Sequence, residues 1–198
     1  GDIERVNDRD AYVVEYDEDY YDVAKVKKAL RRGMYQISID CEHVSYRLTT
    51  EAETINNFSY TGTPRQILTQ LLIGTEFHVG RVEPSEVATF SITSEMTCRA
   101  AILSYAASMG YDVEFEDFYV HIYTHRGDTE PKELVERNVV SISKTVSKAD
   151  SSRSYSCTLH APTDIGLGDE VHFRFEKLDI NDTVRVVGLT RQPFTSKD

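Results

Sequence analysis

The sequence contains no tryptophan, few cysteines and prolines, and no long apolar run. A helix needs about 18 apolar residues to cross a bilayer, so a membrane-spanning role is excluded. The three cysteines, Cys41, Cys98 and Cys157, are odd in number and form no CxxC pair, which argues against a structural zinc site or a disulfide framework. We expect reduced thiols in a cytosolic fold. The acidic, polar start of the chain predicts no signal peptide.

Positive charge is also scarce, with 22 Lys and Arg against 33 Asp and Glu in 198 residues, a net charge of −11. This balance argues against wrapping a nucleic-acid backbone, which requires Lys and Arg. Nine of the first 22 residues are acidic, and like charges so dense repel one another unless solvent, a partner or a cation intervenes. The basic cluster Lys27, Lys28, Arg31 and Arg32 is expected to be a solvated strand end and turn.

The N-terminal region is predicted to be β-structure. Residues 11–16 and 20–30 read as strands, and residues 34–44 alternate with the period of a half-buried strand. The turn Arg31-Arg32-Gly33 would join the last two into an antiparallel hairpin. One face of the half-buried strand would carry Tyr35, Ile37, Ile39, Cys41 and His43.

The centre of the chain alternates helix and strand signals. Thr63 and Pro64 predict the start of a helix that ends at Gly74, and a second helix is predicted over about residues 97–109 with Gly110 as its stop. Ser94 or Thr97 could cap the second helix. Strands are predicted at residues 76–82, 87–93, 111–116 and 118–123. This order predicts an α+β lobe with local antiparallel pairing.

The polar residues 126–137 are predicted to be a connector, followed by strands at 138–147, 155–160, 170–175 and 183–190. The predicted fold class is therefore α+β, with a β-rich domain built from both chain ends and a central lobe of two helices and antiparallel strands. In this division residues 1–50 and 138–198 are the two β segments of one domain, residues 51–125 are the lobe, and residues 126–137 join them.

Metal and cofactor chemistry find little support. His121 and His125 are four residues apart, which places two ligands on one helix face, but their context predicts a strand. Cys41 and His43 share a strand face, yet core or edge histidines are the favoured interpretation. Neither GxGxxG nor GxxxxGK[ST] occurs, so no phosphate-binding loop is predicted. We therefore predict no cofactor, and the histidine and cysteine contexts lead us to predict no metal.

Catalytic groups have no better support. Cys98 begins a predicted helix, where a thiol can be acidified, but a catalytic thiol needs a His partner. Glu114, Glu116 and Asp117 lie near a turn and could act as paired carboxylates, although surface acid is the favoured interpretation in so acidic a chain. Residues 126–128 spell the integrin-binding tripeptide Arg-Gly-Asp, a match too short to weigh. We predict no catalytic residues and leave the binding residues undefined.

Tyrosine is abundant, with 12 Tyr beside 8 Phe. Several tyrosines lie on predicted strands, where such rings suit cross-strand pairing and protein interfaces. Carbohydrate binding by stacking is conceivable, and the absence of tryptophan weakens it.

Several segments, taken in order, resemble one protein family. They are the Cys41-Glu42-His43-Val44-Ser45-Tyr46-Arg47-Leu48 ending of the hairpin, residues 71–80 after the Thr-Pro helix, residues 110–119, Arg126-Gly127 followed by residues 138–144, and the closing GLGDEVHF and VRVVGLTR. The family is that of siphophage and prophage tail-tip proteins. This baseplate-hub or tail-associated group is often labelled prophage tail protein or tail endopeptidase.

The resemblance implies a homotrimeric hub that closes the distal end of the tail tube, with a tube-like barrel or sandwich domain formed by both chain ends. Tail-tube, distal-tail and tape-measure proteins would be its partners. Its location would be the virion tail tip, and the bacterial host cytoplasm during assembly. Members usually carry earlier strands, so a truncated or divergent version is expected. Many also carry a peptidoglycan-cleaving domain after the hub, and we expect none after Asp198.

We therefore expect a structural, non-enzymatic virion protein that serves host attachment and DNA delivery without stable nucleic-acid binding. An acidic lumen would repel DNA phosphates and let the genome slide. Two alternatives stay open: a cell-wall-degrading peptidoglycan hydrolase active during infection, and a receptor- or saccharide-binding module.

Overall fold

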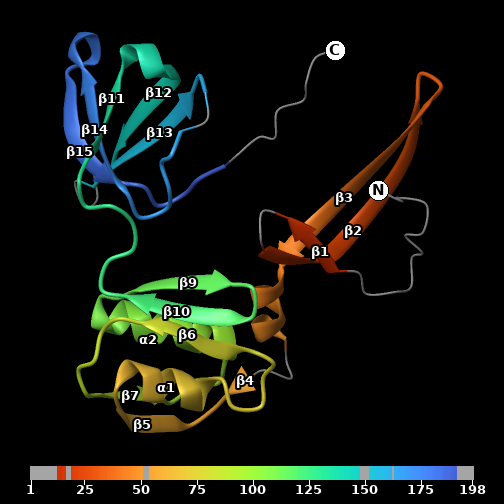
Figure 1. Cartoon of the computed structure of the whole chain (residues 1–198), viewed down its shortest axis with the longest axis vertical. Helices are drawn as coiled ribbons and strands as arrows, with labels where there is room; N and C mark the ends of the chain where they lie inside the picture. Colours follow the sequence, from red (N-terminus) through yellow and green to blue (C-terminus); the bar gives the residue numbers. More distant parts are fainter. Residues whose placement is uncertain (1–12, 17–18, 51–53, 148–151, 162, 191–198) are drawn as a thin grey trace. The chain divides into compact units, whose positions relative to one another are not determined.

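The computed structural model describes residues 13–16, 19–50, 54–147, 152–161 and 163–190. The chain divides into two compact units, Gly1–Thr124 and His125–Asp198, and both α-helices belong to the first (Figure 1). Of the described residues, about 51% lie in strands and 19% in helices, 3-10 turns included, which confirms the predicted α+β class. The assembly of residues 1–50 and 138–198 into one β domain stays a prediction, and most of the acidic first segment lies outside the described residues.

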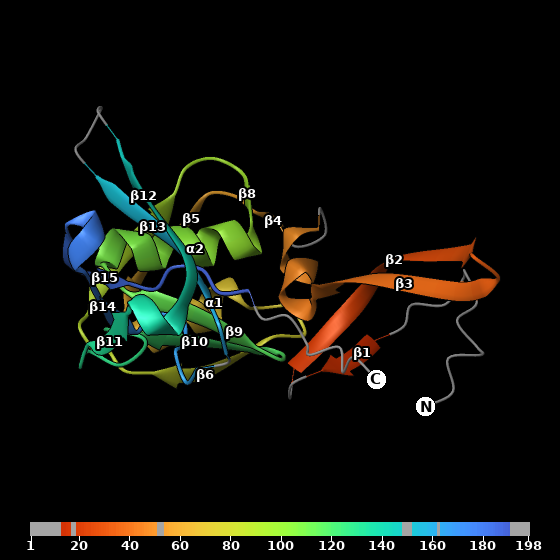
Figure 2. The same ribbon diagram turned by 90° about the horizontal axis from the view of Figure 1, so that it is seen from above.

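The first unit begins with a long β-hairpin. β1 (Val13–Tyr16) pairs with the start of β2 (Asp19–Arg31), and β2 pairs antiparallel with β3 (Met34–His43). Arg32 and Gly33 both adopt positive φ, 51° and 79°, as the favoured two-residue hairpin turn requires. The predicted hairpin is therefore confirmed, and its strands extend away from the lobe in both views (Figures 1 and 2).

β3 is exposed on both faces, so its prediction as a half-buried strand is wrong within this structure. The pairing register places Leu30 opposite Tyr35 and Val26 opposite Ile39, which puts them on the same side of the ribbon as Ile37. We call Val26, Leu30, Tyr35, Ile37 and Ile39 the hairpin apolar face; Lys28, the partner of Ile37, lies on the same side of the ribbon. Periodicity identified which side chains share a face, but it holds no information on whether another layer covers them.

The rest of the first unit is an α+β lobe. Its elements are η2 (Val44–Thr49), β4 (Thr54–Ile55), β5 (Phe58–Gly62), α1 (Pro64–Leu71), β6 (His78–Val82), β7 (Ala88–Ile92), β8 (Met96–Thr97), α2 (Cys98–Met109), β9 (Asp112–Glu116) and β10 (Tyr119–Tyr123). β10 is the central strand of a sheet, parallel to β6 and antiparallel to β9. β5 pairs with β7, and β4 with β8, both antiparallel.

Both helices form where the local signals predict them. The Thr63 hydroxyl accepts from the Gln66 amide, and the Gln66 side chain returns to the Thr63 amide, which completes a capping box around Pro64. Thr97 caps α2, and Gly110 ends it at φ 71°. α1 stops at Leu71, before Gly74. No helix among the described residues is long and apolar enough to span a membrane.

The two helices pack against the sheets around one core. Ile102 and Tyr105 of α2 are fully buried, as are Ile67 of α1 and Val120 of β10. The Tyr105 ring meets Phe90 of β7 edge-on, with centroids 5.2 Å apart. Burial raises the pKa of Tyr105 to about 12, as expected for a phenol deep in an apolar core.

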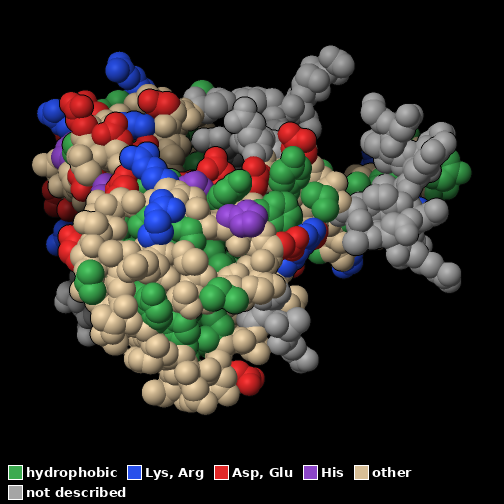
Figure 3. Space-filling view, turned by 60° about the horizontal axis from the view of Figure 1, so that its bottom comes forward, with side chains coloured by type: hydrophobic (Ala, Val, Ile, Leu, Met, Phe, Trp, Pro, Cys, Tyr) green, Lys and Arg blue, Asp and Glu red, His purple; other side chains and the backbone are tan. Residues whose placement is uncertain are grey.

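The outward side of β5 and β7 is an uncharged ladder. Ser59 pairs with Ser91 at 2.9 Å and Thr61 with Thr89 at 2.7 Å, hydroxyl to hydroxyl. Figure 3 looks towards this side of the lobe, and few charged side chains lie over it. Cross-strand hydroxyl pairs of this kind stabilise an antiparallel ladder.

The second unit is a small β structure of two sheets. β14 (Glu170–Phe175) lies between β11 (Lys132–Val135), to which it is parallel, and β15 (Ile180–Arg185), to which it is antiparallel. β12 (Val139–Val146) and β13 (Arg153–Leu159) form a hairpin. The 3-10 turns η4 (Glu136–Asn138) and η5 (Glu176–Leu178) follow β11 and β14.

The two sheets of the second unit share a core of their own. Leu134, Phe173 and Ile180 are buried in it, and the Tyr155 ring of β13 lies 5.3 Å from that of Phe173. Two details of the prediction are corrected here. The connector at 126–137 contains strand β11, whose Leu134 enters the core, and the last strand occupies Ile180–Arg185 instead of residues 183–190.

Replacement of Ile102 tests the lobe core. Ile102→Ala removes a fully buried side chain and is expected to lower the free energy of unfolding by about 2–4 kcal/mol. The neighbouring Leu103, 40% exposed on the same helix, is the matched control, and Leu103→Ala should cost less than about 1 kcal/mol. Denaturant unfolding followed by circular dichroism measures both, and equal losses would contradict this description of the core.

Candidate functional site

One arginine joins the base of the hairpin to the lobe. Arg47, in η2, donates from Nε and Nη2 to the two carboxylate oxygens of Asp22 at 2.7 and 2.6 Å, and from Nη1 to Glu76 at 2.9 Å. Its guanidinium also lies 5.5 Å from the ring centroid of Phe118. The bonds to Asp22 and then Glu76 raise the pKa of Arg47 above its already high value. The planar, permanently charged guanidinium of arginine can form two parallel hydrogen bonds to one carboxylate, which the ammonium group of lysine cannot do.

A second contact at the same place centres on Asp19, the first residue of β2. Its Oδ1 accepts from the Asp117 amide at 2.9 Å and lies 2.8 Å from His43 Nε2. Partial burial works to raise the pKa of Asp19, but the Asp117 amide and His43 outweigh it and hold that pKa below its ordinary value. Asp19 is therefore an ionised anchor between the hairpin and the turn before β10.

The Asp19 contact continues through His43 to a serine. His43 Nδ1 lies 2.8 Å from Ser45 Oγ and accepts from the Ser45 amide at 3.1 Å. Carboxylate, imidazole and hydroxyl in this order are the groups of a serine nucleophile site. Ser45, however, is 1% exposed, and the imidazole nitrogen that faces its hydroxyl caps the start of η2. The set is built to fix the hairpin base, because a hydroxyl buried to this degree cannot meet a substrate.

These contacts bring together the segments that suggested a protein family. The hairpin ending, residues 71–80 and residues 110–119 meet at this junction, through side chains or amides of His43, Arg47, Glu76, Phe77, Asp117 and Phe118. The Phe77 and Phe118 rings lie 5.3 Å apart. We call this set, with Asp19 and Asp22, the hairpin junction. Three of the quoted segments therefore have a structural role, because they connect the hairpin to the lobe.

The carboxylates considered for catalysis lie on the outer face of the three-stranded sheet. Glu114 accepts from the Tyr123 hydroxyl at 2.9 Å, and Glu116 lies 3.2 Å from His121 Nε2. Burial and then the bond to Glu114 raise the pKa of Tyr123 to about 12. Each carboxylate thus lies beside a different ring of β10, and Glu114 alone accepts a hydrogen bond there. Asp117 is not part of this row, because it occupies the turn at φ 49°.

The two candidate histidines fall in different units, His121 in β10 and His125 at the start of the second unit. His121 Nδ1 accepts from the Arg81 amide at 3.0 Å, and its ring lies against Gly80, where a Cβ would be 2.6 Å from the ring. Gly80 is therefore required for this close approach. Across the described ranges no three His, Cys, Asp or Glu side chains form a group able to hold a metal.

The cysteines have separate environments. Cys41 is exposed on the hairpin, Cys157 is half-buried, and Cys98 is buried with its thiol donating to the Leu71 carbonyl at 3.2 Å. Burial raises the pKa of the Cys157 thiol. No disulfide joins these three residues. Cys98 does begin α2, as the sequence predicts, but its sulfur packs in the lobe core.

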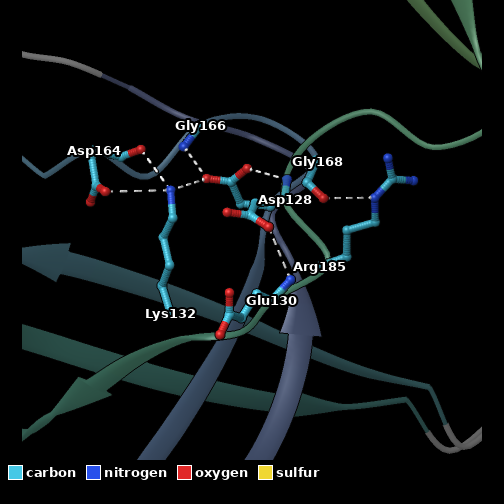
Figure 4. Close-up of polar contacts among 8 residues, drawn as sticks. Asp128, Glu130, Lys132, Asp164, Gly166, Gly168 and Arg185 are labelled. Atoms are coloured by element: carbon cyan, nitrogen blue, oxygen red, sulfur yellow. Dashed lines mark hydrogen bonds and ion pairs between the residues drawn. The ribbon is translucent and has the colours of Figure 1, made fainter.

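The second unit contains a nearly buried carboxylate, Asp169, and Figure 4 labels residues around it, among them Lys132, Gly166 and Asp128. Asp169 accepts from the Asp128 amide at 2.7 Å, the Gly166 amide at 2.8 Å and Lys132 Nζ at 2.8 Å. Lys132 also donates to the Asp164 carbonyl at 2.9 Å. The Lys132 ion pair and the two amides lower the pKa of Asp169 to about 2. A carboxylate with three donors is held firmly in its charged form.

The Arg-Gly-Asp tripeptide is part of the same network. Gly127 and Gly168 cross so closely that a Cβ on Gly127 would lie 2.3 Å from the Gly168 carbonyl carbon, and both have positive φ. Arg185 donates to the Gly168 carbonyl at 3.1 Å (Figure 4). It also donates to the Arg126 carbonyl at 2.9 Å, which closes the crossing. Asp128 uses a side-chain oxygen to accept from the Glu130 amide at 3.0 Å. The tripeptide therefore forms a structural turn.

Sequence reasoning missed Asp19, Arg47 and Asp169. Arg47 and its carboxylate partners are 25 and 29 residues apart, and Asp19 and Asp117 are 98 apart. No local spacing connects such pairs. The one available signal was the position of Arg47 and Asp169 inside the quoted family segments.

The molecule is thus an α+β lobe that carries a β-hairpin, followed by a small two-sheet β unit. Two solved tail proteins share this fold. The prophage tail protein gp18 from Listeria monocytogenes EGD-e matches with a TM-score of 0.58 and 12% identity, over 88% of this chain and 73% of its own. The tail protein from Neisseria meningitidis MC58 matches with a TM-score of 0.60 and 10% identity, over 83% and 72%. No family model and no curated protein matches the sequence.

Replacement of Arg47 tests the hairpin junction. Arg47→Lys keeps the charge but loses the bidentate bond to Asp22, and is expected to lower local stability by about 1–2 kcal/mol. Hydrogen exchange in peptides from β2 and β3 should become faster. Arg81→Lys is the control, since Arg81 also pairs with a carboxylate and lies over a ring but is 68% exposed. Unchanged exchange in the hairpin of Arg47→Lys would contradict the role of this contact.

Replacement of Asp169 tests the second unit. Asp169→Asn removes the charge that three donors face, and is expected to cost about 2–3 kcal/mol in local stability. Asp164→Asn is the control, because the Asp164 side chain is 89% exposed and 3.6 Å from Lys132; its effect should be below about 0.5 kcal/mol. Hydrogen exchange in β11 and β14 measures both, and equal effects would be evidence against the network.

The same carboxylate predicts an acid-sensitive second unit. The folded-state pKa of Asp169, about 2, lies below its ordinary 3.8, so the unfolded chain takes up the proton first. The ionised Asp169 therefore contributes about 2 kcal/mol to the free energy of unfolding. This contribution is complete above about pH 4 and is lost as the pH falls towards 2. The stability difference between the wild type and Asp169→Asn should therefore shrink from pH 6 to pH 2. A constant difference would be inconsistent with an ionised Asp169.

Proposed function

We propose that this protein is a structural component of a phage or prophage tail, and specifically a tail-tip or baseplate hub protein. In this proposal it closes the distal end of the tail tube as a homotrimer and takes part in host attachment and DNA delivery. The observation that carries the tail role is the fold, shared with two solved tail proteins over 88% and 83% of this chain. The tail-tip assignment is supported by the family segments, three of which meet at the hairpin junction.

The shape of the surface supports an assembly role. A ring of subunits needs sheet edges and apolar or aromatic faces that another chain can cover. The hairpin offers both, because its apolar face is exposed and β3 is an edge strand. The proposed partners are tail-tube, distal-tail and tape-measure proteins, in the virion and, during assembly, in the host cytoplasm. The net charge of −11 suits a passage to which DNA does not adhere.

The proposed role involves no catalysis. Three candidate groups among the described residues are held within the fold: Ser45 is buried beside His43, Glu114 accepts from the Tyr123 hydroxyl, and Glu116 lies 3.2 Å from His121 Nε2. A general acid or base must reach the proton that it transfers, and these contacts place the candidate groups against the protein itself.

Location in the particle tests the tail role. Gold-labelled antibodies against this chain, applied to particles induced from the host, are expected to mark the distal end of the tail in electron micrographs. Label along the tube would keep a tail role and contradict the hub assignment. A tail role would be contradicted by particles that carry no gold label and whose denatured proteins react with an antibody against a tube protein but not with the antibody against this chain.

Activity on cell wall tests the enzyme alternative. The full chain is expected to produce no clearing in a zymogram of purified cell wall. Clearing that is lost in Glu114→Gln or Glu116→Gln, while Glu130→Gln retains it, would overturn the non-enzymatic proposal. Glu130 is a suitable control because it is an exposed acid of the second unit.

A further inference from the structure

The hairpin apolar face requires a cover. Among the described residues it leaves Leu30 62%, Tyr35 90% and Ile37 43% exposed, with Ile39 at 38%. A two-stranded ribbon is marginal in water by itself and gains stability from a layer packed on its apolar side. Contiguous exposed apolar side chains of this kind mark an interaction surface.

Among the described residues, the outer edge of the hairpin has no strand paired with it. β3 lies at the edge of the β1-β2-β3 sheet for its whole length of ten residues. Natural edge strands are commonly blocked by proline, lysine or a bulge that twists the edge away. The β3 sequence MYQISIDCEH contains neither proline nor lysine. Its open backbone groups are thus available to a partner that approaches from the side.

Charge identifies the kind of partner. Residues 25–39 carry five Lys and Arg and no acidic residue, while the other 183 residues hold all 33 acidic residues against 17 basic ones. The distal hairpin is therefore strongly positive in a chain that is otherwise negative by 16 charges. Complementary charge of this kind steers association and fixes orientation. Two hairpins packed on each other would instead bring like charges together.

We propose that the hairpin of one copy docks on an acidic surface of a second copy of this chain and buries the hairpin apolar face there. The contact joins two different surfaces, so each copy can use its hairpin on one neighbour and its acidic surface on another, and a ring closes when the rotation allows. This inference rests on the proposed ring-forming function and assigns its interface. DNA would match the charge but would leave the apolar face uncovered.

Solution assembly of the full chain tests the proposal. We expect the wild type to self-associate in sedimentation velocity, and Tyr35→Thr/Ile37→Thr to weaken that association by at least about tenfold. Threonine keeps a strand-forming residue at both sites. The matched control is Gln36→Thr/Ser38→Thr on the opposite face of the same strand, which should associate like the wild type. Lys28→Glu, which places an acid opposite Ile37 on the apolar side of the ribbon, should also weaken association.

Cys41 supplies a readout at the contact. It is exposed and shares its side of β3 with Tyr35 and Ile37. Its alkylation, followed by mass spectrometry of its peptide, should slow as the wild type associates and stay fast in Tyr35→Thr/Ile37→Thr. Unchanged circular dichroism and protected Cys98 would show that the variant is folded.

Several outcomes would overturn the inference. A wild type that stays monomeric at about 100 µM would do so, whether Cys41 reacts freely or is protected by a cover within the same chain. So would equal association of the two threonine variants. A wild type that binds DNA but does not self-associate, and whose DNA binding is lost in Lys27→Glu/Lys28→Glu, would show instead that the hairpin binds nucleic acid. If gold label still marks tail tips in any of these cases, this inference fails, while the proposed location at the tail tip stands.

Discussion

A two-stranded ribbon has too few strands to bury its own apolar side chains, and the first unit is organised around that constraint. The base of the ribbon is fixed by charged hydrogen bonds, from Arg47 to Asp22 and Glu76 and from the Asp117 amide to Asp19. Such directional contacts hold the strands at a defined place on the lobe. They leave the distal hairpin free to present its apolar face outward.

The second unit solves a similar problem with a different device. Two chain segments cross where Gly127 and Gly168 leave no space for a side chain, and Asp169 satisfies amides from both segments. Lys132 balances the buried charge. Because unpaired buried charge is costly, the network is stable only when all of its donors are in place. In both units, charged side chains with several hydrogen-bond partners therefore hold together chain segments that are distant in sequence.

Local signals predicted much of this fold. Thr63 with Pro64, and Thr97 with Gly110, placed both helices because caps act over three or four residues. Strand β11 was missed because its pairing with β14 is parallel and distant, so a four-residue polar-looking segment carried no signal. The alternation of residues 34–44 gave the shared face of β3 correctly and its burial wrongly. Arg47 and Asp169 could not be singled out, since their partners are fixed by tertiary structure.

The likeness to tail proteins at 10–12% identity also has a physical basis. A core accepts many apolar residues of suitable volume, so a fold persists while most positions differ. Junction residues are more constrained, because Arg47 needs two carboxylates and Gly168 needs a position without Cβ. Three of the segments that resemble the family meet at the hairpin junction, which holds the base of the hairpin that we assign to assembly.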